Sequence, residues 1–421
     1  MRAMKDSGIP WIGEIPEGWG IDTIGNLYTL RTEKVSDKDY APLSVTKMGV
    51  VPQLETAAKT DDGDNRKLVR VGDFAINSRS DRRGSCGISA YDGSVSLINL
   101  VLTPRGQMYP RFYNWLFHTE LFADEFYKWG HGIVDDLWTT RWQEMKRISI
   151  VSPSYQEQQR IAEFLDRKCG EVDEMIGLQE QIIEELKAYK QSVITEAVTK
   201  GLNPDAPMRD SGIDWIGFIP EHWEVKRLKQ VLSSPLQYGA NESGMPYQEN
   251  LPRYVRITDI LDNSLRDNIE KQSLTEQQAD GYILQHNDIL FARSGGTVGK
   301  SFIFNEKYGK CAFAGYLIKA SVNELMDAKF VYYFTQTNCY EEWKKQIFIQ
   351  STIQNIGAGR YSQLQLTIPS TYEQQAIADY LDEKCADIDS LIQTKQSKID
   401  SLKEYKKSII YEYVTGKREV E

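Results

Sequence analysis

The sequence predicts an α+β protein made of two similar mixed modules, each followed by a long helix. Three observations support this. A Trp/Pro motif occurs at Asp6–Trp19 and again at Asp210–Trp223, with 11 of 14 positions identical. A Gln/Cys motif, at Glu157–Cys169 and again at Glu373–Cys385, opens a proline-free stretch with heptad spacing. Between these motifs, short β-like runs alternate with turn residues.

The spacing of the motifs indicates duplication of whole domains. The Trp/Pro motifs are 204 residues apart and the Gln/Cys motifs 216 apart, so the second copy carries about a dozen extra residues. Repeats of roughly 20–50 residues would indicate a solenoid, and this period is far longer. We expect domains at residues 1–150 and 206–368, and helical segments at 151–205 and 369–421.

The regions between the motifs favour a mixture of strands and helices. Runs of β-branched and aromatic residues end at Gly, Asp or Asn, as strands do. These runs are 68–77, 88–103, 281–293 and 300–305. Aromatic stretches at 112–129 and 330–346 favour helices. Each variable region is therefore predicted to be a mixed α+β domain.

The two helical segments share one heptad register. Positions a and d hold Cys169, Val172, Ile176, Ile183, Leu186, Val193 and Ala197 in the first copy, and Cys385, Ile388, Ile392, Ile399, Leu402, Ile409 and Tyr413 in the second. Polar residues interrupt both seams at matching places, Gln179 with Lys395 and Lys190 with Lys406. Shared interruptions favour packing of the two helices against each other. About 44 helical residues make a spacer of roughly 65 Å.

Composition is that of a soluble globular protein with an expected cytoplasmic location. Of the 421 residues, 41% are hydrophobic and 26% charged. No apolar run reaches the length of a membrane span, and the first residues lack a signal segment. The five cysteines form no CxxC pair, so neither a zinc knuckle nor a disulfide framework is expected.

The net charge of −10 is concentrated in the helical segments. Residues 155–205 contain 11 acidic and 6 basic residues, and residues 369–421 contain 11 and 8. The two domains are nearly neutral, so the overall acidity does not exclude DNA binding by them.

The sequence contains no complete catalytic motif. Residues 295–301, GGTVGKS, resemble a phosphate-binding loop, but Ser294 occupies the position of its first glycine, which favours a turn between strands. A nuclease-like Glu224-Val225-Lys226 has no counterpart in the first copy. The four histidines lack the spacing of metal ligands. We therefore expect a chain that is not an enzyme and binds no metal or cofactor itself.

The remaining candidates are basic residues suited to DNA. Aligned without gaps, residues 72–85 match residues 287–300. Arginine can bind guanine edges with two hydrogen bonds or pair with phosphate, and glycine lets a loop approach a groove closely. The turn residues are Arg79, Arg82 and Arg83 in the first copy and Arg293 and Lys300 in the second. Weaker candidates are Lys47, Arg66, Lys67, Arg141, Lys226, Lys229, Arg253 and Arg256.

For each of these residues the alternative is a solvated turn without a DNA contact. The two copies agree in their framing motifs and differ most in such loops. That pattern is typical of two modules that read different sequences.

The doubled Trp/Pro motif, the Gly-Asp or Asn-Asp turn and the doubled Gln/Cys motif resemble the specificity subunit (HsdS) of type I restriction–modification systems. The resemblance covers essentially the whole chain. It implies two target-recognition domains and two long helices packed as an antiparallel coiled coil, with pseudo-two-fold symmetry. Each domain is then expected to read one half of an asymmetric, bipartite double-stranded DNA target, while the helices set the spacing of the half-sites.

The same resemblance implies partners that supply the chemistry. Two modification subunits are expected to dock on the helices and carry S-adenosylmethionine for adenine-N6 methylation. Restriction subunits that use ATP and Mg are expected to join them. Two alternatives remain: a bivalent scaffold that binds proteins without reading bases, and a single-chain nuclease–methyltransferase, which the missing motifs disfavour.

Overall fold

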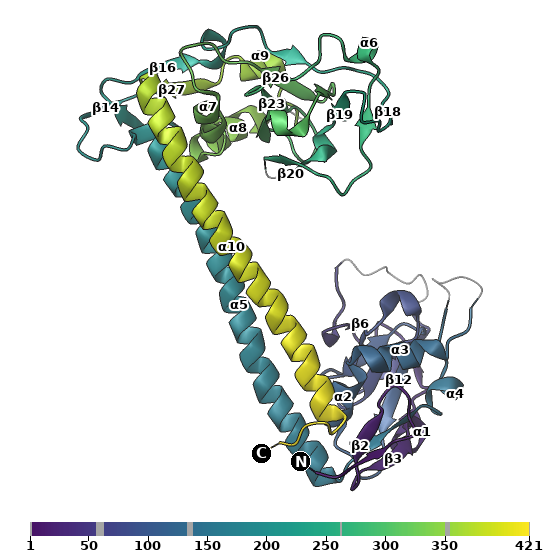
Figure 1. Ribbon diagram of the computed structural model, residues 1–421. Coiled ribbons are helices and arrows are strands. Elements are labelled where there is room, and N and C mark those ends of the chain that lie inside the picture. Colours follow the sequence, from purple (N-terminus) through teal and green to yellow (C-terminus); the bar gives the residue numbers. More distant parts are fainter. Residues whose placement is uncertain (1, 56–62, 133–137, 262, 350–353, 421) are drawn as a thin grey trace. The chain divides into compact units, whose positions relative to one another are not determined.

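The computed structural model describes residues 2–55, 63–132, 138–261, 263–349 and 354–420 (Figure 1). The chain divides into two compact units. Unit 1 contains Met1–Glu180 and Gln396–Glu421, and unit 2 contains Gln181–Lys395. Each unit takes part of both long helices, α5 (Tyr155–Lys200) and α10 (Thr371–Val414). The predicted α+β class with two mixed domains is confirmed. The limits drawn from the sequence for domains and helical segments stay a prediction, since the units divide both helices.

Unit 1 is built around a four-stranded antiparallel sheet with the order β10-β9-β12-β4. Its strands are β4 (Tyr28–Leu30), β9 (Phe74–Asn77), β10 (Cys86–Ile88) and β12 (Asn99–Pro104). The smaller sheets are β11 (Gly93–Val95) with β8 (Arg66–Val69) and β5 (Lys34–Val35), β6 (Leu43–Thr46) with β7 (Gly49–Pro52), β3 (Gly20–Thr23) with β13 (Ser149–Ser152), and β1 (Met4–Asp6) with β2 (Glu14–Pro16). The helices are α1 (Ile24–Leu27), α2 (Pro110–Phe117), α3 (Glu120–Lys128) and α4 (Trp142–Met145).

Unit 2 repeats this sheet as β24-β23-β26-β17 and adds a second one. The repeated strands are β17 (Gln237–Tyr238), β23 (Ile289–Ala292), β24 (Ser301–Ile303) and β26 (Leu317–Ala320). The second sheet contains β18 (Met245–Pro246), β22 (Gln272–Ser273), β19 (Arg253–Val255) and β25 (Cys311–Phe313). The strand pairs are β14 (Met208–Asp210) with β15 (Phe218–Pro220), β16 (Glu224–Arg227) with β27 (Gln365–Ile368), and β20 (Ile260–Leu261) with β21 (Ser264–Leu265). The helices are α6 (Glu276–Ala279), α7 (Ala328–Phe334), α8 (Asn338–Ile349) and α9 (Ala358–Tyr361).

Equivalent elements show where the copies differ in length. From β9 to β23 the offset is 215 residues, and from α4 to α9, β13 to β27 and α5 to α10 it is 216. The Trp/Pro motifs are offset by 204. Most of the extra residues of unit 2 therefore lie between its Trp/Pro motif and β23, where strands β18, β19 and β22 form.

Each aromatic stretch that favoured helix is broken into two helices by a threonine. The Thr119 hydroxyl donates to the Leu116 carbonyl at 2.7 Å and accepts from the Phe122 N–H at 3.2 Å, which caps α3. Thr337 makes the same two bonds, at 2.7 and 3.2 Å, before α8. A threonine side chain at this position satisfies an unpaired N–H of the first helical turn.

In each unit the domain core is continuous with the helix pair. In unit 1, Trp19 and the aromatic residues of α2 and α3 form one buried cluster with Leu165 of α5 and Val414 of α10. In unit 2, Trp223 shares a buried cluster with Val198 of α5 and Leu381 of α10. Burial of this apolar surface fixes each domain on the helices beside it.

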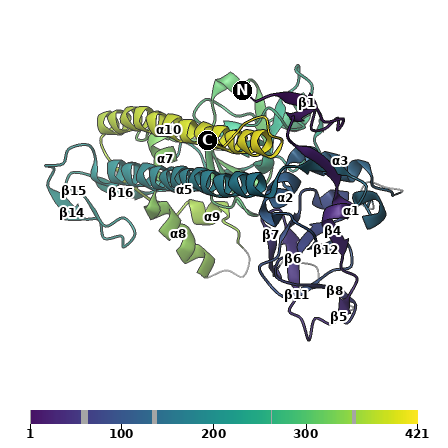
Figure 2. The ribbon, with the colours of Figure 1, turned by 90° about the horizontal axis from the view of Figure 1, so that it is seen from below.

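The helices pack antiparallel along the predicted heptad seam. All a and d side chains of both copies are buried or half-buried. In unit 1, Phe164 of α5 packs against Tyr413 of α10 with ring centroids 4.4 Å apart and the rings tilted by 34°. Further along α5, Asp173 meets Lys406, so α10 runs in the opposite direction. Figures 1 and 2 show the two helices side by side. Among the described residues, no helix is long and apolar enough to cross a membrane.

Candidate nucleic-acid interface

Two of the four polar interruptions of the seam, Lys190 and Lys406, form reciprocal ion pairs. In unit 2, Lys190 of α5 binds Asp389 of α10 at 2.7 Å. In unit 1, Lys406 of α10 binds Asp173 of α5 at 2.6 Å. The lysines are 28% and 26% exposed and both aspartates are 58% exposed, so the two copies form the same contact in the same environment.

A buried glutamine in each Gln/Cys motif attaches the domain to its helix. The side-chain oxygen of Gln158 accepts the Tyr109 N–H at 2.8 Å, and its Nε2 donates to the Pro153 carbonyl at 2.8 Å. Gln374 accepts the Asp327 N–H at 2.7 Å and donates to the Pro369 carbonyl at 2.9 Å. Each glutamine thus joins the beginning of a long helix to the beginning of α2 or α7.

An aspartate two turns later makes a second connection in each unit. Asp166 accepts the indole N–H of Trp115 at 2.9 Å and pairs with Arg111 at 2.9 Å. Asp382 accepts the Tyr333 hydroxyl at 2.6 Å and pairs with Lys329 at 2.6 Å. Burial and this hydrogen bond raise the pKa of Tyr333. The sequence analysis did not single out these residues. Asp166 and Asp382 could have been found from it, because they are identical polar residues at the repeat offset of 216.

The glutamate before each buried glutamine is held by a different partner. In unit 1, Arg2 binds Glu157 at 2.5 Å and lies over the Trp19 ring. In unit 2, His222 binds Glu373 at 2.8 Å. Burial raises the pKa of Glu373, but the hydrogen bonds from His222, Ser370 and Trp223 outweigh it and lower the pKa to about 2.

In unit 1 the candidate arginines occupy the turn between β9 and β10. The Ser80 N–H donates to the Trp138 carbonyl at 3.1 Å, and Arg79 bridges to Thr139. Arg141 follows as the N-cap of α4. The structure therefore brings the Arg79 turn and the Arg141 segment together, although they lie about 60 residues apart in the sequence.

The arginines of this turn differ in their surroundings. The Arg82 side chain is 67% exposed, and its nearest carboxylate is the neighbouring Asp81, at 3.5 Å. Arg83 forms an ion pair with Asp124 of α3. Arg79 and Arg141 are half-buried and exposed, respectively. Arg82 is thus the residue of the turn best placed to bind a ligand from solvent.

The equivalent turn of unit 2 is attached in the same way. The Ile356 N–H donates to the Arg293 carbonyl at 2.9 Å, and Ser294 bridges to Asn355 before α9. The turn joins the antiparallel strands β23 and β24, which confirms that GGTVGKS is a turn between strands. Lys300 is exposed at its end. The two turns are therefore equivalent in position and different in sequence.

Arg293 is held by an aromatic ring. Its guanidinium lies 5.0 Å from the centre of the Tyr238 ring and donates to the Gly315 carbonyl at 3.4 Å. Tyr316, next in the chain, is 63% exposed, and its carbonyl accepts the Arg293 N–H at 3.1 Å. A guanidinium beside the exposed Tyr238 ring offers both charge and stacking surface, which suits nucleic acid. Neither tyrosine was singled out from the sequence.

The two weaker arginine candidates of unit 2 have partners inside the fold. Arg253 is buried in β19, donates to the Arg266 carbonyl at 2.6 Å and lies 3.6 Å from Asp267. Arg256 pairs with the buried Asp259 at 2.9 Å. Both side chains hold the second sheet, in a different part of unit 2 from the turn. Contact of any candidate residue with DNA stays a prediction.

Cysteines and other possible metal ligands are scattered over the described part of the chain. No group of three or more His, Cys, Asp or Glu in that part could hold a metal ion. All five cysteines are buried. Burial raises the pKa of Cys169 and of Cys311 to about 11, which makes both thiols poor nucleophiles.

Comparisons with known proteins identify similar chains. A sequence profile described as "Type I restriction modification DNA specificity domain" matches residues 220–415. The MjaX putative type I restriction enzyme specificity subunit of Methanocaldococcus jannaschii is 23% identical over 96% of this chain and 95% of its own length. The MjaVIII specificity subunit of the same organism is 25% identical over 65% of this chain and 62% of its own length, less than two thirds.

Solved structures share the fold. A chain from a study described as "Structural basis underlying complex assembly and conformational transition of the type I R-M system" has a TM-score of 0.73 at 15% identity, covering 95% of this chain and 98% of that one. The HsdS subunit of Thermoanaerobacter tengcongensis has a TM-score of 0.53 at 16% identity, covering 96% of this chain and 98% of that one.

Proposed function

Because the chain belongs to the family of type I restriction–modification specificity subunits, we propose that it selects the DNA target of such a complex. Each domain reads one half of a bipartite double-stranded target. One observation carries the proposal: the two units keep the same attachments to the helices and carry different residues in the equivalent turns. A shared frame positions two readers, and the differing turns give each its own sequence.

The helix pair is the surface for two modification subunits in this proposal. Those subunits carry S-adenosylmethionine and methylate adenine N6, and restriction subunits supply the ATP- and Mg-dependent steps. This chain contributes target selection without catalysis or a cofactor of its own. The assignment of DNA sequence recognition to this chain rests on its family and on the geometry of the two turns.

Domain replacement tests the proposal. Residues 20–150 are exchanged for the matching domain of a relative, and the chain is expressed with its modification subunit. Methylome sequencing should show one changed half-site and one unchanged half-site, because specificity travels with the base-contacting loops. A simultaneous change of both half-sites would contradict independent readers.

The spacing role of the helices has a separate test. One heptad added to α10 lengthens it by roughly 10 Å, or about 3 base pairs of DNA, and keeps its seam facing α5. Methylation of targets that differ only in spacer length should then favour a longer spacer. Retention of the original spacer by an active variant would remove this role from the helices.

The alternative of a protein-binding scaffold differs in its salt dependence. Phosphate contacts make DNA affinity fall steeply with salt, since bound counterions are released. The purified complex of the chain with its modification subunit should therefore bind DNA that contains its target sequence more weakly as the salt concentration rises. A complex that binds protein but no DNA at low salt would favour the scaffold.

A further inference from the structure

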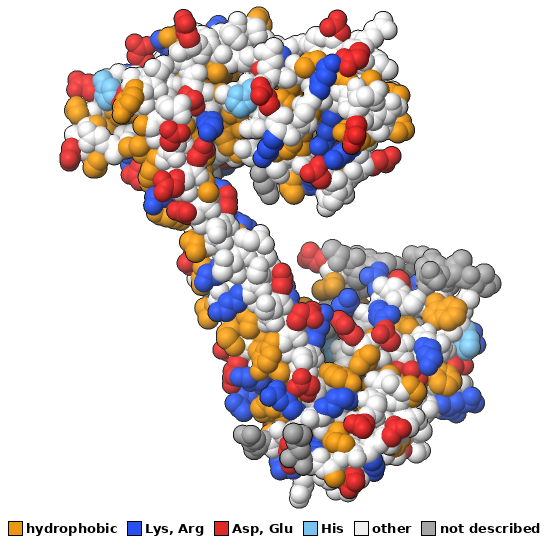
Figure 3. Space-filling view, viewed as in Figure 1, with side chains coloured by type: hydrophobic (Ala, Val, Ile, Leu, Met, Phe, Trp, Pro, Cys, Tyr) orange, Lys and Arg blue, Asp and Glu red, His pale blue; other side chains and the backbone are white. Residues whose placement is uncertain are grey.

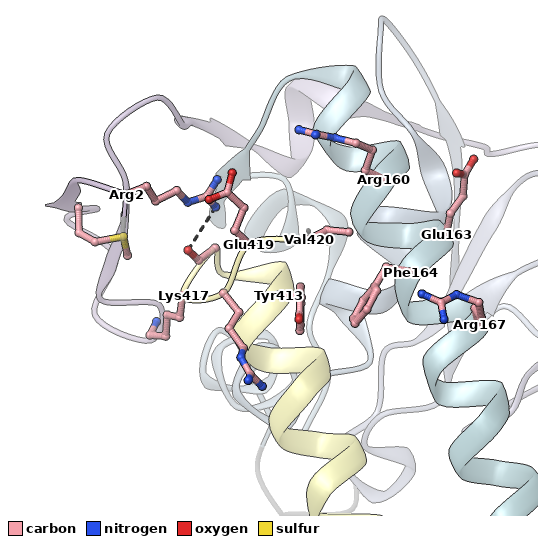
Figure 4. A pocket seen from close by; sticks show the side chains of 12 residues that line it. Arg2, Arg160, Glu163, Phe164, Arg167, Tyr413, Lys417, Glu419 and Val420 are labelled. Carbon is pink, nitrogen blue, oxygen red and sulfur yellow. Dashed lines mark hydrogen bonds between the residues drawn. The ribbon is translucent and has the colours of Figure 1, made fainter.

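A hollow of about 1160 Å³ lies in unit 1, where the chain ends meet the long helices (Figure 4). Arg160 and Arg167 reach it from α5, and Lys417 and Arg418 from the segment after α10. Arg2 lies on its other side, where its guanidinium donates to the Gly416 carbonyl at 3.2 Å. We name this hollow the cationic pocket. Figure 3 shows Lys and Arg side chains gathered near the lower ends of α5 and α10.

The lining carries an excess of positive charge. It contains five basic residues against two acidic ones, Glu163 and Glu419. Three of the basic side chains already bind carboxylates at its edge: Arg2 binds Glu157, Arg167 binds Glu171, and Arg418 binds Glu412. Arg160 is exposed and makes no such ion pair among the described residues. The Lys417 ammonium donates to the Ile12 carbonyl at 2.7 Å. Arg160 is therefore the cation of the pocket that a further carboxylate can bind without displacing a partner seen among the described residues.

Unit 2 lacks this charge at the equivalent place. The repeat offsets of 204 and 216 put Ala206 in place of Arg2, Ala376 in place of Arg160 and Glu383 in place of Arg167. Alignment of Gly201 with Gly416, the glycines that end the two long helices, puts Leu202 in place of Lys417 and Asn203 in place of Arg418. The backbone is nevertheless matched, since Gly201 and Gly416 both end a long helix with positive φ, 78° and 72°. The difference therefore lies in the side chains.

We propose that the cationic pocket receives a carboxylate-bearing segment of a partner polypeptide, and that unit 2 makes no such contact. This inference rests on the proposed function, in which partner subunits dock on the helices. The helical segments are otherwise acidic, with 11 acidic and 6 basic residues in 155–205. An acidic segment is repelled along most of that surface and attracted at the pocket, which fixes where it binds.

The lining favours a polypeptide over DNA. The rings of Phe164 and Tyr413 pack against each other in the pocket, and Met4 and Val420 add apolar surface. A DNA duplex keeps its bases stacked inside and presents mainly phosphates to a protein, so it covers little of that apolar surface. An acidic peptide with interspersed apolar side chains covers it. Glu163 and Glu419 would also repel a duplex, with its dense phosphate charge, more strongly than they would repel a peptide that carries a few carboxylates.

The test uses the full chain and a labelled peptide of repeated Glu-Glu-Leu, with binding followed by fluorescence anisotropy. The pocket variant combines Arg160→Ala with Arg167→Glu, which installs the unit 2 residues. The matched control combines Lys398→Ala with Lys403→Glu, the same change of charge at exposed positions of α10 in unit 1 outside the pocket. The pocket variant should weaken peptide binding about tenfold and the control less than about twofold, because only the first removes charges beside the ligand.

Competitors separate the possible ligands. Equal weakening by both variants, or no binding by the wild type, overturns the pocket. Displacement of the peptide by inorganic phosphate at equal concentration would reduce it to a site for simple anions. A short duplex whose binding is lost in the pocket variant alone would assign it to DNA and overturn the polypeptide.

The complex gives a second readout. Native mass spectrometry of the chain co-expressed with its modification subunit should show loss of one subunit copy from the pocket variant, at a salt concentration where the control variant keeps both. Loss of both copies, or of neither, would contradict a contact confined to unit 1. A wild-type chain that binds the peptide but forms no such complex would sink the proposed function and leave the pocket standing.

Discussion

Units 1 and 2 hold the long helices with matching side-chain contacts, and they differ where their surfaces face solvent. Gln158 and Gln374 make equivalent buried bonds, and Lys406 and Lys190 make equivalent ion pairs. By contrast, the turn after β9 carries the exposed Arg82, while the turn after β23 carries Arg293 against Tyr238. Contacts that set position are duplicated, and contacts open to a ligand are not.

This difference separates two kinds of polar residue. A buried glutamine or an interhelical ion pair does the same structural work in both copies, so both copies retain it. An exposed arginine in a turn has no structural task that both copies share. Substitutions should therefore act alike in the two units when they touch the frame, and differently when they touch the turns.

The largest effect is expected at the buried glutamines. Gln158→Leu leaves the Tyr109 N–H and the Pro153 carbonyl without the side chain that binds them. Each unsatisfied buried group costs about 1–3 kcal/mol, so unit 1 should lose about 2–6 kcal/mol. Gln374→Leu should cost unit 2 a similar amount. Urea unfolding followed by tryptophan fluorescence measures both.

The neighbouring glutamines are the controls for this prediction. Among the described residues, the side chains of Gln159 and Gln375 donate to Glu163 and Asp379 on their own helices, near solvent. Gln159→Leu and Gln375→Leu should change stability by less than about 0.5 kcal/mol. If all four substitutions had equal effects, the buried bonds would not be what attaches the domains.

The second prediction contrasts the two turns. Arg82→Ala should weaken recognition of one half-site by about 1–3 kcal/mol if the side chain reads a base, with no loss of folding. Arg293→Ala should weaken the other half-site and also lower stability, because its guanidinium packs on Tyr238. Methylation rates on single-base target variants, together with thermal unfolding, check both.

For Arg82, a phosphate contact would have a different signature. Affinity would fall for every sequence and the dependence on salt would become shallower. Unchanged methylation and unchanged salt dependence would show that Arg82 is a solvated residue without a DNA contact.

The long helices and the domains attached to them could be predicted from the sequence because the duplication repeats their motifs. The α+β class, the long helices and their heptad seam followed from motifs repeated at fixed offsets, and the turn role of residues 295–301 followed from Ser294. The break of each aromatic stretch at Thr119 and Thr337 was not predicted. An amphipathic run that contains a capping threonine can have the same composition as a run that forms one continuous helix. Only the backbone geometry at the threonine distinguishes the two.

The candidate site was less predictable, since its geometry depends on contacts distant in sequence. The bridge from Arg79 to Thr139 and the packing of Arg293 on Tyr238 join segments about 60 and 55 residues apart. Residue type alone did not separate Arg82, which faces solvent, from Arg253, which is buried beside Asp267. The pairing of Lys190 and Lys406 with aspartates was hidden for the same reason.

A smaller effect is expected at the interhelical ion pairs. Lys406→Glu should lower stability by about 0.5–1 kcal/mol, because the pair with Asp173 is partly exposed. Adding Asp173→Lys should restore most of that loss by reversing the pair. The same exchange at Lys190 and Asp389 should give equal values. Double-mutant cycles at low and high salt measure the coupling, and a coupling insensitive to salt would exclude an ionic origin.

The smallest effect concerns a contact between domain and helix whose partner differs between the units, that of Glu373. Hydrogen bonds from His222, Ser370 and Trp223 outweigh the effect of burial and lower the pKa of Glu373 to about 2. A carboxyl whose pKa is lower in the folded state adds stability above its unfolded pKa of about 4.3, and that stability is lost as pH falls toward 2. Partial exposure keeps the contribution small. Between these pH values, the thermal midpoint of the wild type should therefore fall further than that of Glu373→Gln, which cannot titrate. Parallel falls would mean that the charge of Glu373 contributes nothing to unit 2.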